Sequence, residues 1–79
     1  MIARVVPSLN LFVVICGKTI LIYHSTYSKI THLDKVKDIN ELVGGLPPEA
    51  AKVVVSAIKE AQEAGEVENI TIENLDKFS

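Results

Sequence analysis

The chain has 79 residues, which is enough for one small domain whose single core rarely supplies more than about 3–5 kcal/mol of net stability. One cysteine excludes an internal disulfide, and a net charge of −2 gives no overall attraction to a polyanion. Because 48% of the residues are hydrophobic, we expect the chain to bury apolar surface against a second copy of itself.

The charges are unevenly distributed along the chain. Residues 1–37 carry five basic residues and one acidic residue, a balance of +4, whereas residues 38–79 carry three basic and nine acidic residues, a balance of −6. This asymmetry is compatible with a nucleic-acid contact made by the basic half. It is equally compatible with attraction between the halves, within one chain or between two copies.

A mostly apolar stretch covers residues 5–23, and its only charge is Lys18. A membrane helix needs about 20 apolar residues, and a central lysine costs about 2.5–3.5 kcal/mol. Pro7 and Gly17 interrupt the stretch further, and its residues are largely β-branched. We therefore expect no membrane association. A cytoplasmic location is expected, since a lone thiol fits a reducing compartment.

The first third of the chain predicts antiparallel strands. Residues 2–6 form a first strand that ends at Pro7, and residues 11–16 and 19–23 form a hairpin around Gly17-Lys18. Glycine at the first position of a two-residue loop favours a type II′ turn, because glycine adopts a positive φ without penalty. This turn predicts that Cys16 lies opposite Thr19 and that the pairing continues from there.

The predicted register gives the hairpin two apolar faces. One face carries Phe12, Val14, Cys16, Thr19, Leu21 and Tyr23. The other face carries Leu11, Val13, Ile15, Ile20, Ile22 and His24. Two helices can cover only one face of a sheet, so we expect a homodimer that buries the other face. The residues predicted to form the dimer interface are Leu11, Val13, Ile15, Ile20 and Ile22.

The second half predicts helix, helix and strand. A first helix is capped by Thr31 and ends before Gly44-Gly45. A second helix opens at Pro47-Pro48, carries a broad apolar arc over residues 50–64 and ends at Gly65.

The predicted fold is a single small α+β domain over residues 1–79, with a β-meander, the order β-β-β-α-α-β, and helices on one face. Its expected parts are a β-hairpin or meander over residues 1–24, two helices over residues 32–65 and a last strand over residues 66–72.

Residues with catalytic potential do not form a recognised pattern. Cys16 with His24 or His32 is a candidate nucleophile–base pair, but Cys16 is expected to be a packed, inert core thiol. Two histidines give too few ligands for a metal site, and Pro47 and Pro48 remove the N–H donors that a phosphate needs. We therefore expect no enzyme activity, no metal and no cofactor.

The polar stretch 23–32 is the best binding candidate, because it holds hydroxyls, aromatic rings and a lysine. It is interpreted either as a loop before the next helix or as a partner-binding segment, with Lys18, His24, Tyr27 and Lys29 as the contact residues. The expected function is a small non-catalytic homodimeric interaction or regulatory module, such as an adaptor, an inhibitor or an antitoxin-like protein, which binds itself and an unidentified protein partner. The alternative is a nucleic-acid-binding regulator that uses the basic N-terminal half.

Overall fold

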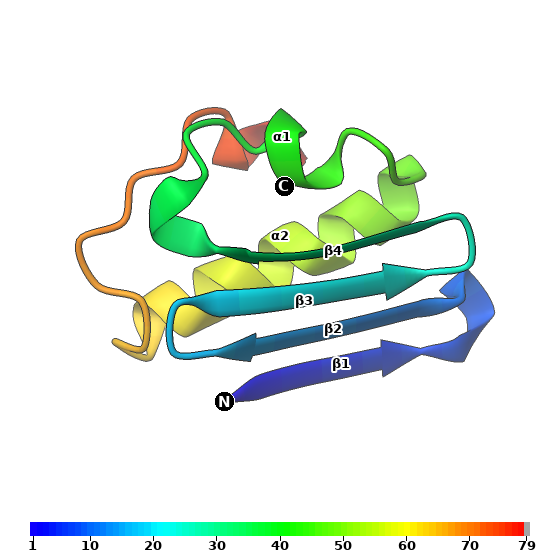
Figure 1. The fold of residues 1–79 in the computed structure, drawn as a ribbon, viewed down its shortest axis with the longest axis horizontal. Coiled ribbons are helices and arrows are strands. Elements are labelled where there is room, and N and C mark those ends of the chain that lie inside the picture. The colour runs from blue at the N-terminus through cyan, green and yellow to red at the C-terminus, as the bar shows by residue number, and fades with distance from the viewer. Residues whose placement is uncertain (79) are drawn as a thin grey trace.

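An antiparallel sheet of four strands lies in front of a long helix in the structure, a computed structural model that describes residues 1–78 (Figure 1). The strands are β1 (Ile2–Val6), β2 (Leu11–Cys16), β3 (Thr19–His24) and β4 (Tyr27–His32). Their order in the sheet is β1-β2-β3-β4, so every strand pairs with its neighbour in the sequence. The predicted α+β class with an antiparallel meander is confirmed at this level.

The β2–β3 hairpin has the register that its turn predicts. Cys16 pairs with Thr19, and Phe12 pairs with Tyr23 at the far end. Gly17 has φ +59°, whereas Lys18 is absent from the residues with positive φ, and this combination identifies a type II′ turn. Strand β1 also forms as predicted and is followed by Pro7 in the 3₁₀ helix η1 (Pro7–Leu9).

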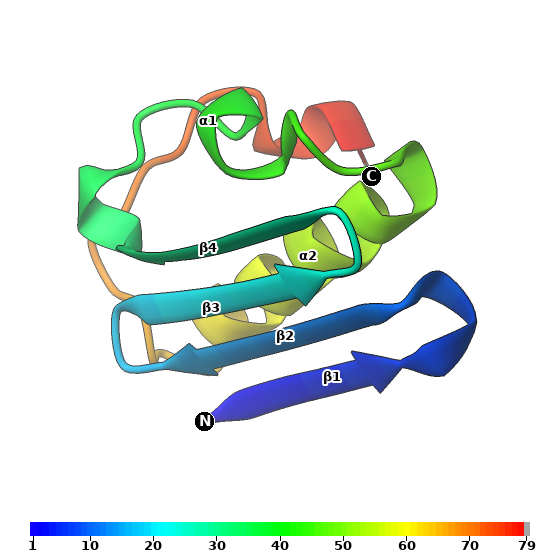
Figure 2. The ribbon, with the colours of Figure 1, turned by 45° about the vertical axis from the view of Figure 1, so that its right-hand side comes forward.

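Helix α2 (Pro48–Glu63) covers one face of the sheet, and both views place it behind the strands (Figures 1 and 2). Its buried residues are Ala50, Ala51, Val54, Val55, Ala57, Ile58 and Ala61. The small alanine side chains let the helix backbone come close to β1 and β2, against which α2 packs. The broad apolar arc predicted for this helix is therefore used within the chain itself.

The segment between β4 and α2 differs from the predicted helix capped by Thr31. It contains only the 3₁₀ helix η2 (Leu33–Lys35) and the short helix α1 (Asn40–Val43). The start of α1 is fixed by Asp38, whose Oδ1 accepts the Asn40 N–H at 2.8 Å, while Glu41 Oε2 accepts the Asp38 N–H at 3.1 Å. The two bonds resemble a capping box placed one residue before the N-cap Ile39, so they order the chain ahead of α1 from Asp38 onward.

Residues 27–32 form strand β4 where the sequence predicted a polar loop. The strand adds to β3 with Tyr27 opposite His24 and Thr19 opposite His32. Its two faces carry similar mixtures of polar and apolar residues, so it lacks the alternation that marks a half-buried strand. The strand order is consequently different from the expected β-β-β-α-α-β.

The C-terminal segment packs on the core without forming the strand expected over residues 66–72. Its only bridge in the described chain joins Glu73 to Asp38, and Asn69 and Asn74 adopt positive φ values of 60° and 64°. Asn69 lies within the expected strand, and its left-handed conformation interrupts an extended backbone there. Ile72 is nevertheless 6% exposed, and the segment ends in the 3₁₀ helix η3 (Leu75–Phe78), whose apolar residues pack on the core.

Within residues 1–78, no helix has both the length and the apolar character needed to cross a membrane.

Candidate functional site

The side of the sheet that faces away from α2 is the candidate site, and we call it the outer sheet face. Neither view shows a helix or loop in front of it (Figures 1 and 2). The strand register assigns eleven side chains to it: Ala3, Val5, Phe12, Val14, Cys16, Thr19, Leu21, Tyr23, Ser28, Ile30 and His32. All of them are exposed or half-buried, in contrast to the opposite side of the central strands.

These side chains lie in rows that cross the sheet. The central row is wholly apolar and runs Ala3, Val14, Leu21, Ile30. The next row runs Val5, Phe12, Tyr23, Ser28. Val5, Tyr23 and Ile30 remain 65%, 60% and 71% exposed, which are high values for large apolar side chains. The outer sheet face is therefore a continuous apolar patch rather than a set of isolated exposed residues.

The outer sheet face contains no lysine, arginine, aspartate or glutamate. Basic residues of the strands project to the other side: Arg4 forms an ion pair with Glu60, and Lys29 Nζ donates to the Glu41 carbonyl at 2.8 Å. A third row, next to the β2–β3 turn, runs Cys16, Thr19, His32, and in it Thr19 Oγ1 lies 3.2 Å from His32 Nδ1. The face can thus bind apolar groups and offers few contacts to phosphates.

A shallow hollow of about 390 Å³ opens where the outer sheet face meets η1 and the β3–β4 turn. Its apolar wall comes from Val5, Phe12 and Tyr23, and Asn10 and Ser25 stand at its rim. A hollow of this composition fits an apolar side chain of a partner better than a charged ligand.

The four residues predicted to contact a partner do not form one surface. Lys18 is exposed in the β2–β3 turn, whereas His24, Tyr27 and Lys29 lie at the other end of the hairpin or along β4, on the side that faces away from the outer sheet face. His24 is buried, and its Nδ1 accepts the Thr26 N–H at 3.3 Å. A partner-binding role for these residues stays a prediction.

Tyr27 and Lys29 attach β4 to the segment that follows it. The Tyr27 hydroxyl donates to the Leu42 carbonyl at 3.0 Å, and its ring lies against Gly45, where an added Cβ would meet Tyr27 Cδ1 at 2.8 Å. Burial of the ring raises the pKa of the Tyr27 hydroxyl above its usual value. These contacts give Tyr27 a structural role.

The residues predicted to form the dimer interface lie inside the chain. Leu11, Val13, Ile15, Ile20 and Ile22 are 3% exposed or less, because they form the sheet side of the core under α2. They are inaccessible to a second copy in this fold. This corrects the predicted location: the sheet face that α2 leaves open is the opposite one, which includes Val14 and Leu21.

Cys16 is exposed on the outer sheet face, and the expectation that it packs in the core is corrected accordingly. His24 lies on the other side of the sheet and at the far end of the hairpin, so it cannot act as a pair with Cys16. His32 lies on the same face as Cys16, but Thr19 stands between them in the row and its Oγ1 contacts the His32 ring. Among residues 1–78, no three histidine, cysteine or acidic side chains gather in a way that could hold a metal ion.

A second hollow of about 510 Å³ follows the solvent side of α2 next to η3. Its lining mixes Lys52, Ser56, Glu63 and Phe78 with Lys59, whose Nζ lies 2.6 Å from Asp76 Oδ1. Its lining contains both basic and acidic side chains, and no buried side-chain nitrogen or oxygen among the described residues lacks a hydrogen-bond partner. It is a weaker candidate than the outer sheet face.

Compared with known proteins, the chain matches no family model, no curated protein and no solved structure.

Proposed function

We propose that the protein is a small non-catalytic interaction module that forms a homodimer by packing the outer sheet face of one copy on the same face of another. The observation that carries this proposal is the apolar, uncharged patch around Leu21, next to side chains such as Ile30 that are 71% exposed. Soluble monomers rarely leave a continuous patch of this kind in water.

The lack of charge on the outer sheet face supports a second copy as the occupant. In an interface with two-fold symmetry, each residue meets the same surface on its partner, so a charge near the axis meets its own sign. An apolar face avoids this repulsion, and two such faces pack about 10 Å apart in a β-sandwich.

The size of the patch supports a weak rather than a permanent dimer. With strands about 4.8 Å apart and rows about 6.8 Å apart, four strands and three rows cover about 400 Å² of flat area. Two copies then bury about 800 Å² of flat area. The accessible surface is somewhat larger because it follows the contours of the side chains, and it lies near the lower limit of about 1,000–1,200 Å² for specific complexes. We expect a dissociation constant in the micromolar range.

The position of the reactive side chains supports the non-catalytic part of the proposal. A nucleophile needs an adjacent base, but Cys16 and His24 lie on opposite faces and at opposite ends of the β2–β3 hairpin. His32 shares the face of Cys16, but it lies two strands away with Thr19 between them, which is about 9.6 Å at the usual strand spacing. An apolar face without a deep hollow is typical of a surface that binds another protein.

Sedimentation velocity across micromolar concentrations tests the proposal. We expect the wild type to shift from monomer to dimer, and Leu21→Glu, which places a charge at the centre of the outer sheet face, to stay a monomer with an unchanged circular dichroism spectrum. Ser56→Glu is the matched control, because it adds the same charge to the exposed side of α2 and should still dimerise. A wild type that remains monomeric at several hundred micromolar, or a Leu21→Glu variant that still dimerises, would refute the proposal.

A further inference from the structure

The two edges of the sheet are protected differently. Along β4, the segment of residues 33–46 lies next to the strand in both views, and Tyr27 and Lys29 donate hydrogen bonds to it (Figures 1 and 2). Along β1, no segment lies beyond the strand in either view (Figures 1 and 2). Strand β1 is therefore the uncovered edge, and an uncovered edge is a template for pairing with another chain.

The register identifies the backbone groups that point to this edge. A two-residue turn makes Cys16 and Thr19 a hydrogen-bonded pair, so alternate residues of β2 point their backbone groups to β3 and the others point to β1. Residues 11, 13 and 15 point to β1, where they pair with residues 6, 4 and 2. The N–H and C=O groups of Ala3 and Val5 consequently point away from the sheet.

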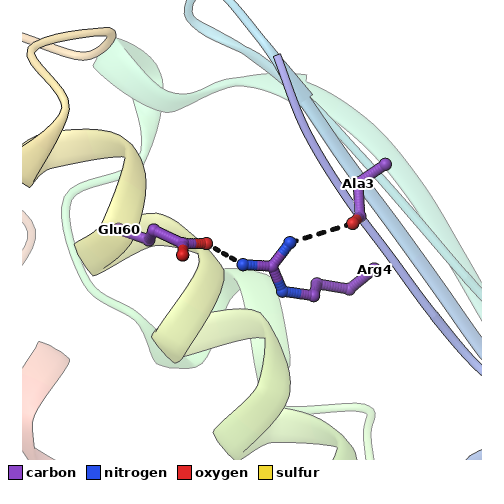
Figure 3. Close-up of polar contacts among 3 residues, drawn as sticks. All are labelled: Ala3, Arg4 and Glu60. Atoms are coloured by element: carbon purple, nitrogen blue, oxygen red, sulfur yellow. Dashed lines mark hydrogen bonds and ion pairs between the residues drawn. The ribbon is translucent and has the colours of Figure 1, made fainter.

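One of these outward carbonyls already has a partner. Arg4 Nη1 donates to the Ala3 carbonyl at 3.0 Å, and Arg4 Nη2 forms an ion pair with Glu60 Oε2 on α2 (Figure 3). The guanidinium thus lies along the strand edge, and its second nitrogen is fixed by the ion pair with Glu60 of α2. We call this arrangement the Arg4 cap.

We propose that the Arg4 cap prevents a second copy of the chain from pairing with the free edge of β1. In an antiparallel β1–β1 pair centred on Arg4, the Ala3 carbonyl of one copy accepts the Val5 N–H of the other. The guanidinium already donates to that oxygen, so an incoming N–H has to displace it or share the oxygen with it. The pair would also bring two Arg4 side chains directly opposite each other, and like charges in that position are destabilising.

The exposure of the ion pair favours this role over a role in stability. The side chains of Arg4 and Glu60 are 42% and 51% exposed, and ion pairs with such exposure contribute little to folding. The rest of β1 has no charged side chain, so Arg4 is the residue that distinguishes this edge from an aggregation-prone apolar strand.

The test replaces Arg4 and then blocks the edge by a second change. Arg4→Thr keeps a strand-forming residue but removes the cap, and we expect its average mass in sedimentation velocity to rise at least twofold above that of the wild type. Adding Ala3→Pro removes an outward N–H without affecting the ladder to β2, and we expect it to restore the wild-type mass. Arg4→Lys keeps the charge but lacks the two-nitrogen fork that joins Ala3 and Glu60, so its mass should lie between those of the wild type and Arg4→Thr.

Amide hydrogen exchange gives a second measurement at the same place. The Val5 amide should exchange rapidly in the wild type and become protected in Arg4→Thr. Should Arg4→Thr fail to fold, Glu60→Gln removes only the support from α2 and should raise the mass in the same direction by a smaller amount. An unchanged mass in the folded variants, or a raised mass that Ala3→Pro does not lower, would overturn the proposal.

The same experiment separates this inference from the face-to-face dimer. When both two-fold contacts form, they alternate and produce an open-ended assembly. When only the β1 edge pairs, Arg4→Thr gives a discrete dimer, which supports the cap and refutes the proposed dimer through the outer sheet face.

Discussion

Replacing Gly17 tests whether the β2–β3 hairpin depends on its turn. Gly17 has φ +59°, and a Cβ added there would meet no atom within 4 Å, so a substitution introduces backbone strain without a steric clash. Strain of this kind costs about 1–3 kcal/mol for a residue other than glycine. For a domain of this size, Gly17→Ala should lower the melting temperature by about 4–24 °C.

The assay is thermal unfolding followed by circular dichroism, with Gly17→Val as the comparison. Because a positive φ is harder for a β-branched residue to adopt, valine should lower the melting temperature further than alanine does, although the space around Gly17 is open. An unchanged melting temperature in Gly17→Ala would refute the assigned turn. A Gly17→Val variant that is more stable than Gly17→Ala would refute the reasoning that the strain lies in the backbone.

Two further predictions concern the segment that follows β4. Gly45→Ala should destabilise the protein by about 1–3 kcal/mol in urea unfolding, because the added Cβ would lie 2.8 Å from the Tyr27 ring, which its hydrogen bond to the Leu42 carbonyl keeps in place. The destabilisation should be smaller in a Tyr27→Leu background. If the free-energy changes of the two substitutions simply add, the contact is contradicted. The pKa of Asp38 lies below its usual value of 3.8, mainly because its carboxylate accepts the Asn40 N–H and, to a smaller extent, because it accepts the Asn74 side-chain amide. The ionised carboxylate therefore stabilises the fold above pH 3.8, and this stabilisation is lost as the pH falls through the lowered pKa. Between about pH 4 and pH 2, the free energy of unfolding should therefore change less with pH for Asp38→Asn than for the wild type. An equal pH dependence in the two proteins would count against the capping role of Asp38.

The elements with strong local signals were predictable from the sequence. The Gly17 turn set the register of the hairpin, and the apolar arc after Pro48 set the length and the buried side of α2. In both cases one local interaction decides the geometry: a positive φ in the turn and a helical period in α2.

The elements that tertiary contacts define were not predictable. Strand β4 forms because β3 offers an edge and because Tyr27 and Lys29 find carbonyl partners in a segment more than ten residues away. The predicted C-terminal strand over residues 66–72 does not form because Asn69, inside it, turns the backbone. A single sequence gives no direct signal for either outcome.

The sequence predicted that the hairpin has two apolar faces, but it did not predict which face stays exposed. The register separated the two apolar faces of the hairpin, but the choice of the face that α2 covers depends on where the later elements pack. The exposed residues Val5 and Ile30 were missed, since they lie on strands next to the hairpin. Strand β4 has no alternating pattern that would mark Ile30 as part of a half-buried strand, so the sequence held no direct signal for it.

Each strand pairs with the next strand in the chain, so the sheet can form by closing three short connections, two of which are two residues long. The C-terminal segment must instead return over 35 residues to place Glu73 beside Asp38, and the entropy lost in closing a loop grows with its length. We therefore expect the sheet to assemble early in folding and the C-terminal segment to dock last. We expect the same segment to detach first, so that the amides of Ile39 and Glu73, which bond across this bridge at 2.9 and 2.8 Å, exchange with solvent before the sheet opens.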